Sequence, residues 1–303
     1  MMMNISRREF LKKSGGTMSV IGFLGLPLSG CINSSKKVIV GAHPWVYAAP
    51  LPEYDITPVL DIIFSDMKYA GLDGVELMHN PLRSAEATLM IGELKEKHGL
   101  PVIGTSYGGN MWDRTKHPEI IEDAENVILN LEKVGGRTMG ISVGNARHKK
   151  TEEELDAQAE LLTQLLKFGK EHGVILNLHN HTYEVEDNMH DLRGILKRIP
   201  DFPLGPDLNW CIRGGVDPLD YINEFGDRMV FVHLRNQYVD GSWSESLAEG
   251  DMDHASIGKA LKEKNFNGDL VIELAHERDF NPTRPIRESL KMSRDFIREV
   301  MGY

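Results

Sequence analysis

The segment GVILNLHNHTYE, residues 173–184, decides the fold of this chain. Its first half is an apolar run, which ends abruptly in His179, His181 and Glu184. Short continuous apolar runs are typical of strands that are buried on both faces, as in parallel sheets. Side chains that can bind metals or transfer protons follow this strand directly. They predict a functional site at the strand end if other strands end in the same way.

The alternation of apolar runs with amphipathic segments continues along the chain and indicates parallel strands joined by helices. The predicted strands cover residues 37–44, 73–78, 101–106, 137–144, 173–179, 202–207, 228–236 and 268–276. The predicted helices include 85–98, 118–134, 187–199, 255–264 and 284–301. Helix starts are marked by Thr57-Pro58 and by the capping-box spacing of Thr151 and Glu154.

Eight such units in about 270 residues predict an α/β fold, a single (β/α)₈ TIM barrel. We expect one domain over residues 31–303. A doubly wound sheet is less compatible with the sequence, because no glycine fingerprint for a dinucleotide follows the first strand.

Residues 1–30 have the features of an export segment that precedes the folded domain. Arg7-Arg8 in SRREFLKK resembles a twin-arginine signal, and the apolar stretch 18–28 is too short to span a membrane comfortably. LSGC, which ends at Cys31, resembles a lipoprotein processing site; the alternative is a plain signal peptide with a chance cysteine. We expect a periplasmic protein exported by the twin-arginine pathway, with a lipid on Cys31 as its only attachment to the membrane.

The composition is that of a globular protein, with 41% hydrophobic and 26% charged residues among 303. The formal net charge of −11 argues against nucleic acid as a partner, because binding to phosphate backbones needs clustered Lys and Arg. A small sugar or sugar acid remains compatible with this charge, since a local site can differ from the global field.

Polar side chains stand near the carboxyl end of nearly every predicted strand. They are His43, Glu76, His179, His181, Asp207, His233, Arg235 and Glu273. In a barrel these ends meet at one mouth, where such residues indicate a functional site. Buried charges need partners, and one divalent metal can serve several carboxylates and imidazoles at once. We expect Mn²⁺ as the bound metal, although Zn²⁺, Co²⁺ and Fe²⁺ also suit nitrogen and oxygen ligands. Because no thiolate is among the candidate ligands, nothing favours zinc over the others.

Several motifs resemble those of the xylose isomerase-like TIM barrels, the sugar phosphate isomerase/epimerase superfamily. They are DGVEL (73–77), LHNH (178–181), Asp207 followed by RGGVDP (213–218), FVHLRN (231–236) and VIEL (271–274). The resemblance covers the chain from about residue 38 to the C-terminus. It implies a single metal ion held by residues from four strands, which here are His179, Asp207, His233 and Glu273.

Two positions depart from the pattern of these barrels. His179 stands where the family usually has a glutamate that is both ligand and base, and Trp210 replaces a frequent histidine. One base is therefore expected to be Glu273, and the other His181 or Glu184. A narrower resemblance, in FGDRMVFVHLRN (225–236), is to mannonate dehydratase, a related barrel that removes water from a sugar acid.

These features predict a divalent-metal-dependent sugar isomerase or epimerase that abstracts a proton next to a sugar carbonyl. Arg235 would stabilise the negative charge that develops. The residues expected to contact the substrate are His43, Glu76, Trp210 and Arg235. Two alternatives stay open: a dehydratase or lyase acting on a sugar acid or keto-sugar, and a carbohydrate-binding lipoprotein without catalytic activity.

Overall fold

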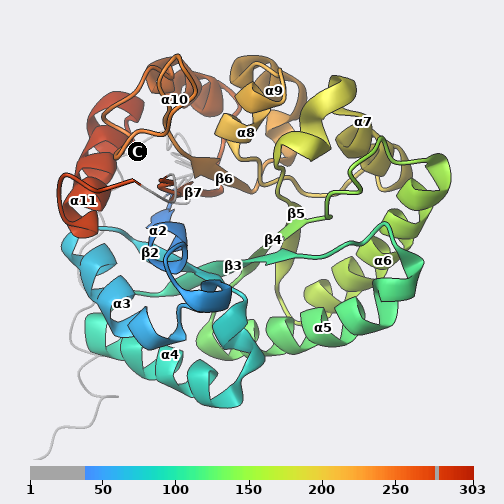
Figure 1. Ribbon diagram of the computed structural model, residues 1–303, viewed down its shortest axis with the longest axis horizontal. Helices are drawn as coiled ribbons and strands as arrows, with labels where there is room; N and C mark the ends of the chain where they lie inside the picture. Colours follow the sequence, from blue (N-terminus) through green and yellow to red (C-terminus); the bar gives the residue numbers. More distant parts are fainter. Residues whose placement is uncertain (1–37, 277–279) are drawn as a thin grey trace, which may run out of the picture. The chain divides into compact units, whose positions relative to one another are not determined.

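The computed structural model describes residues 38–276 and 280–303. Among these residues, seven strands form one parallel sheet in the order β5-β4-β3-β2-β1-β7-β6. The strands are β1 (Val40–Ala42), β2 (Gly74–Met78), β3 (Val102–Gly108), β4 (Thr138–Ser142), β5 (Ile175–Leu178), β6 (Phe231–Leu234) and β7 (Asp269–Ile272). Helices surround the sheet (Figure 1). This architecture confirms the predicted α/β TIM barrel.

The predicted sixth strand is present only as isolated bridges between β5 and β6. Leu204 bridges to Leu178 on one side and to Met229 on the other, and Asp207 bridges to His233. Proline lacks a backbone N–H and so interrupts a ladder of hydrogen bonds. Residues 203 and 206 are both prolines, which explains why this segment closes the barrel without a regular strand.

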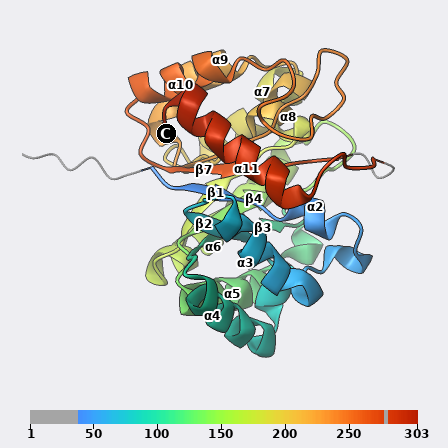
Figure 2. The same ribbon diagram turned by 90° about the vertical axis from the view of Figure 1, so that its left-hand side faces the viewer.

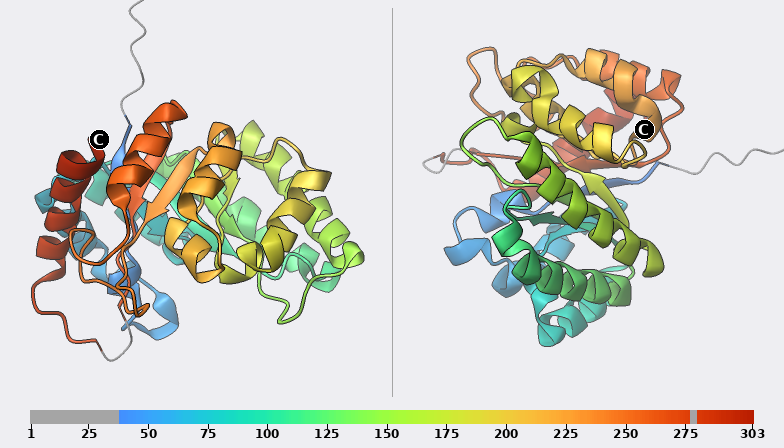
Figure 3. Two further views of the ribbon diagram at one scale, coloured as in Figure 1. Left: turned by 90° about the horizontal axis from the view of Figure 1, so that it is seen from above. Right: turned by 90° about the vertical axis from the view of Figure 1, so that its right-hand side faces the viewer.

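The helices follow the strands in the predicted alternation. They are α2 (Trp45–Ala48), α3 (Leu60–Tyr69), α4 (Ala85–His98), α5 (His117–Val134), α6 (Glu152–Glu171), α7 (Thr182–Arg198), α8 (Leu208–Arg213), α9 (Pro218–Phe225), α10 (His254–Glu263) and α11 (Ile286–Phe296). A π-helical turn, Ile297–Met301, extends α11. α11 packs against α3 and its extension packs against α10, which closes the ring of helices (Figures 2 and 3).

Of three predicted helix starts, one is confirmed, one is wrong and one is shifted. Thr151 caps α6 in a capping box with Glu154, as predicted. Thr57 does not cap α3, because its hydroxyl donates to Asp55 and a short 3₁₀ turn precedes the helix, so that prediction was wrong. α7 begins at residue 182 instead of 187, and residues 186–189 interrupt its helical geometry.

A small apolar cluster fills the barrel below the mouth. It consists of Ile103, Phe231 and Val271. Ile103 occupies the space that two glycines leave open, because a Cβ on Gly41 or Gly74 would overlap its side chain. The interior is therefore packed and is not a pore.

The layer above this cluster is charged. Side chains two positions apart on a strand point to the same face, so His233 follows Phe231 and Glu273 follows Val271 into the barrel. His233 pairs in register with Val271 across β6 and β7. The polar side chains thus stand on an apolar floor and face the carboxyl ends of the strands.

The predicted export segment 1–30 and the predicted lipidation site Cys31 lie outside the described residues. Within the described residues, none of the helices has the length and apolar character needed to cross a bilayer.

Candidate metal centre at the barrel mouth

Four side chains from separate strands converge at the mouth. His179 follows β5, Asp207 lies in the bridging segment, His233 is in β6 and Glu273 follows β7. One potential ligand atom from each lies within 4.8 Å of the others, and all four residues are buried. The four positions that the family resemblance implied as metal ligands are therefore brought together in space.

Glu76 fixes the orientation of His233 from below. The Nε2–H of His233 donates to Glu76 Oε2 at 2.5 Å, although the residues are 157 positions apart. This leaves Nδ1 of His233 facing Glu273 Oε2 at 2.7 Å. Neither of these two buried atoms has a hydrogen bond of good geometry among the described residues. Once Nδ1 loses its proton, these two atoms would be electron-pair donors that could share a cation, and a carboxylate behind a ligating imidazole is usual in metal sites.

The chemistry of the donors also fits a divalent cation. Two imidazoles and two carboxylates suit Mn²⁺, Zn²⁺, Co²⁺ or Fe²⁺. Cys211 does not join them: its thiol contacts the amide of Asn180 at 3.6 Å, and burial raises its pKa far above the ordinary value. The donor set is therefore nitrogen and oxygen alone.

Arg235 connects two of the four side chains. Its Nε donates to Asp207 Oδ2 at 2.6 Å, and its Nη2 lies 2.7 Å from Glu273 Oε1. The other oxygen of Asp207 accepts the backbone N–H groups of Asn209 and Trp210 and so caps α8. Arg235 partly compensates the charge of both carboxylates, and their remaining lone pairs can still serve a cation.

The cluster strongly shifts the pKa values of its members. Burial, and then the neighbouring His233, lowers the pKa of His179 well below the ordinary value, which favours the neutral form that binds metals. Burial also opposes a charge on His233, but Glu76 and Glu273 outweigh it and raise the pKa of His233 to about 10. Burial likewise opposes ionisation of Glu273, yet Arg235, His43 and His233 hold its pKa well below the usual range.

His43 lies at the edge of the same cluster. Its Nε2 is 3.0 Å from the hydroxyl of Ser106, and its Nδ1 is 3.4 Å from Glu273 Oε1. Ser106 was not expected from the sequence. It points inward from β3 next to a histidine 63 positions earlier, a pairing that depends on the register of the barrel.

His181 belongs to a separate hydrogen-bonded group on the rim. Ser142 Oγ donates to Glu184 Oε1 at 2.9 Å and lies 3.0 Å from Nδ1 of His181 and 2.7 Å from the hydroxyl of Tyr183. When Ser142 gives its one proton to ionised Glu184, Nδ1 of His181 can donate to Ser142 Oγ. Nε2 of neutral His181 then carries the unshared lone pair, and 36% of the side chain is exposed.

Glu184 is held inside this group. Its Oε2 accepts the backbone N–H of His181 at 2.7 Å, and its Oε1 also accepts the N–H of Val143. Burial, and then Asp191, raises the pKa of Glu184 to about 7. The carboxyl group therefore caps the start of α7, and the structure does not bring it into the four-residue cluster.

Comparison with known proteins agrees with this geometry. Residues 64–296 match the family model described as xylose isomerase-like TIM barrel. The chain belongs to this family. A curated relative, the inosose dehydratase of Clostridium perfringens, is 24% identical over 295 residues and covers 88% of this chain and 98% of its own.

Solved structures of sugar epimerases share the fold. An L-ribulose 3-epimerase superposes with a TM-score of 0.71 at 18% identity, covering 88% of this chain and 95% of its own. The 3-keto-D-glucoside 4-epimerase of E. coli gives a TM-score of 0.67 at 17% identity, covering 86% and 100% of the two chains.

In this member of the xylose isomerase-like family, tryptophans stand beside the candidate metal ligands. The ring of Trp210 lies 5.4 Å from the guanidinium of Arg235 and 5.4 Å from the ring of Trp243. Trp243 was missed in the sequence, because it lies in the loop 236–253, where no periodic pattern marks individual residues. The only available signal was that this long loop follows a strand and so belongs to the mouth.

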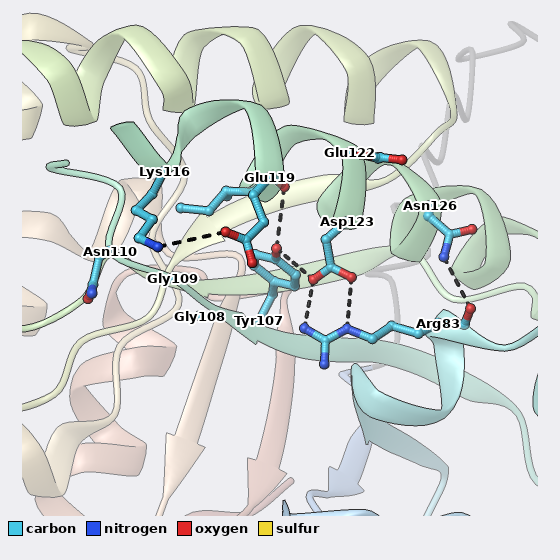
Figure 4. A pocket seen from close by; sticks show the side chains of 11 residues that line it. Arg83, Tyr107, Gly108, Gly109, Asn110, Lys116, Glu119, Glu122, Asp123 and Asn126 are labelled. Atoms are coloured by element: carbon cyan, nitrogen blue, oxygen red, sulfur yellow. Dashed lines mark hydrogen bonds and ion pairs between the residues drawn. The ribbon is translucent and has the colours of Figure 1, made fainter. Parts of the chain in front are cut away.

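A pocket of about 790 Å³ lies outside this centre, against α5 (Figure 4). Arg83 pairs with Asp123 through two hydrogen bonds, and the hydroxyl of Tyr107 donates to the same carboxylate. Tyr107 points outward from β3, whereas Ser106 before it faces His43 inside the barrel. The Arg83–Asp123 pair already occupies its centre, and the pocket contains none of the predicted site residues.

Proposed function

We propose that this protein is a divalent-metal-dependent sugar isomerase or epimerase that abstracts a proton next to a sugar carbonyl. The observation that carries the proposal is the buried convergence of His179, Asp207, His233 and Glu273 at the mouth. The family and the epimerases of the same fold support it. We expect Mn²⁺ as the cation.

Each residue at the mouth has a role in this proposal. A cation held by the four side chains would polarise the substrate carbonyl as a Lewis acid. His181 would take the proton at Nε2, the ring atom left free when Nδ1 donates to Ser142. Arg235 would stabilise the negative charge on the substrate oxygen. Glu76 would keep His233 in its ligating orientation, and His43 would contact substrate hydroxyls.

Glu184 has a different part in this scheme. Three hydrogen bonds already engage its two oxygens. We infer that it fixes Ser142 and the start of α7, and that it does not reach the substrate. His181 is then the base on the β5 side, with Glu273 as the other candidate.

A second candidate function is dehydration of a sugar acid or keto-sugar. The relatives described as inosose dehydratases favour it, since they align over nearly their whole length. Removal of a proton beside a carbonyl begins both reactions, so the same residues would serve.

Export through residues 1–30 and a lipid on Cys31 also belong to the proposal, and they rest on the sequence alone.

Hydrogen exchange in D₂O tests the proposed chemistry. The manganese-loaded protein is incubated with a panel of keto-sugars and keto-glycosides, and NMR follows deuterium at the carbon beside the carbonyl. We expect exchange with at least one of them and its loss in His181→Ala, while Glu184→Gln retains most of it. Tight sugar binding without hydrogen exchange or elimination would contradict the proposed enzymatic activity and favour a carbohydrate-binding protein.

A further inference from the structure

A row of flat side chains borders the metal centre on one side. The rings of Tyr183 and His181 stack at 5.5 Å and 7°, those of His181 and Trp210 are 5.7 Å apart, and those of Trp210 and Trp243 are 5.4 Å apart. All three separations fall in the range of direct aromatic contacts. We call these four residues the aromatic row; it extends from the start of α7 to the loop 236–253.

The far end of the row is rigidly held. The guanidinium of Arg213 lies 3.6 Å from the ring centre of Trp243. Arg213 in turn donates to the carbonyl of Gly241 at 2.6 Å and to Gln237 Oε1 at 3.1 Å. Gln237 also forms a bridge with Trp243 itself. The indole is therefore preformed, which lowers the entropy lost when a ligand binds.

Both tryptophans of the row lie beside Arg235, which contacts the candidate metal ligands. Arg235, which contacts Asp207 and Glu273, lies 5.4 Å from the ring of Trp210 and 5.3 Å from that of Trp243. Nε1 of Trp210 is buried and has no hydrogen-bond partner among the described residues. A buried donor without a partner is costly, and a ligand hydroxyl would satisfy it.

We propose that Trp243 forms a second subsite, which binds the part of the substrate beyond the reacting sugar. The substrate class is then a glycoside, in which the reacting ring carries a second ring, either a sugar or an aryl group. Along the row, His181 contacts the ring of His179 at 5.2 Å, Trp210 follows His181, and Trp243 follows Trp210. A single sugar at the four-residue cluster would lie against His181 and Trp210, and a second ring would lie against Trp243. The position of the reacting ring rests on the proposed function. Stacking on the indole selects for the second ring through its apolar face.

Two non-reacting glucosides test the subsite by calorimetry. Phenyl β-D-glucopyranoside has a second ring, and methyl β-D-glucopyranoside lacks one. We expect the purified, manganese-loaded protein to bind the phenyl compound about tenfold more tightly. In Trp243→Ala the ratio of the two dissociation constants should approach one, while the affinity for the methyl compound is unchanged.

Two further variants keep the test decisive. Arg213→Met keeps both tryptophans but removes the guanidinium and its bonds to Gly241 and Gln237. Trp243 is then less rigidly held, so the ratio should fall by a smaller factor than in Trp243→Ala. Trp112→Ala is the matched control, because its ring contacts His148 at 6.1 Å and is not part of the row. It should leave both affinities unchanged.

The subsite is overturned if both variants keep the full ratio, if both glucosides weaken equally, or if neither glucoside binds. Its failure is distinguishable from failure of the proposed reaction. If the protein discriminates between the two glucosides but catalyses no hydrogen exchange, the subsite is supported and the proposed isomerase activity is contradicted. Exchange on free keto-sugars without a preference for the second ring would do the reverse.

Discussion

Two groups of buried charges in this protein differ in how completely they are matched. Between α6 and α7, Lys150 lies 2.5 Å from Asp191 and 2.7 Å from Gln158, and the amide of Gln158 donates to the second oxygen of Asp191. We call these three residues the Lys150 group. At the mouth, His233 Nδ1 and Glu273 Oε2 approach to 2.7 Å without a hydrogen bond of good geometry.

The difference separates a structural network from a binding site. The Lys150 group pairs every charge with an opposite charge or a dipole, so it needs no further component. In the cluster at the mouth, His233 Nδ1 and Glu273 Oε2 lack a hydrogen bond of good geometry among the described residues, and we propose that a cation completes the cluster. Mutations in the first group should therefore cost stability, and mutations in the second should cost metal and activity.

The largest effect is expected for Glu273→Gln. Loss of this carboxylate removes a ligand, so metal content should fall below one ion per chain and turnover should drop on the order of 10³-fold. Elemental analysis and the exchange assay measure both. Asp191→Asn is the matched control and should keep its metal. A Glu273→Gln protein with a full complement of metal would remove the distinction between the two groups.

The next effect concerns stability. Asp191→Ala leaves Lys150 buried without its counter-ion, and the free energy of unfolding should fall by about 3–5 kcal/mol. Urea denaturation measures this change. Asp156→Ala offers a surface comparison, since its pair with Arg198 is exposed on the Asp156 side and should be worth less than about 1 kcal/mol. Equal losses in the two variants would show that the Lys150 group is not a structural network.

A third effect depends on pH and involves Glu184, whose pKa responds to Asp191 and Lys150 of the Lys150 group. Burial raises its pKa from 4.5 to about 7. The neutral form is thus favoured by folding, and its contribution is complete below about pH 4.5 and lost as the pH rises to about 7. Relative to Glu184→Gln, the wild type should lose about 3 kcal/mol over this interval. Parallel stability profiles for the two proteins would show that folding does not raise the pKa of Glu184.

The smallest effect is expected behind the metal centre. Glu76→Gln keeps the volume of the side chain but weakens the acceptor that orients His233. Such changes usually lower metal affinity by about 10–100-fold. A competition titration with a chelator measures it, and Glu76→Gln should still bind one ion. An unchanged affinity would mean that the orientation of His233 is set by its own strand.

The sequence was sufficient to predict the barrel and the polar ring at its mouth. Apolar runs followed by His or Glu at the strand ends mark both the fold and the side that carries the site. His179, Asp207, His233 and Glu273 were each assigned from motifs near one strand, and the fold brings them together.

The remaining features depend on contacts between distant segments. Glu76 and His233 meet across 157 positions, and Ser142 and Glu184 meet across 42. No local pattern distinguishes a carboxylate that faces a substrate from one that caps a helix, and Glu184 illustrates this. Trp243 is similarly defined only by the loop that carries it.

Crystals grown with Mn²⁺, measured at the manganese absorption edge, test the central claim most directly. We predict one anomalous peak per chain, in contact with His179, Asp207, His233 and Glu273, with Arg235 displaced or retained beside it. A mouth without such a peak, or a peak held by other residues, would contradict the account.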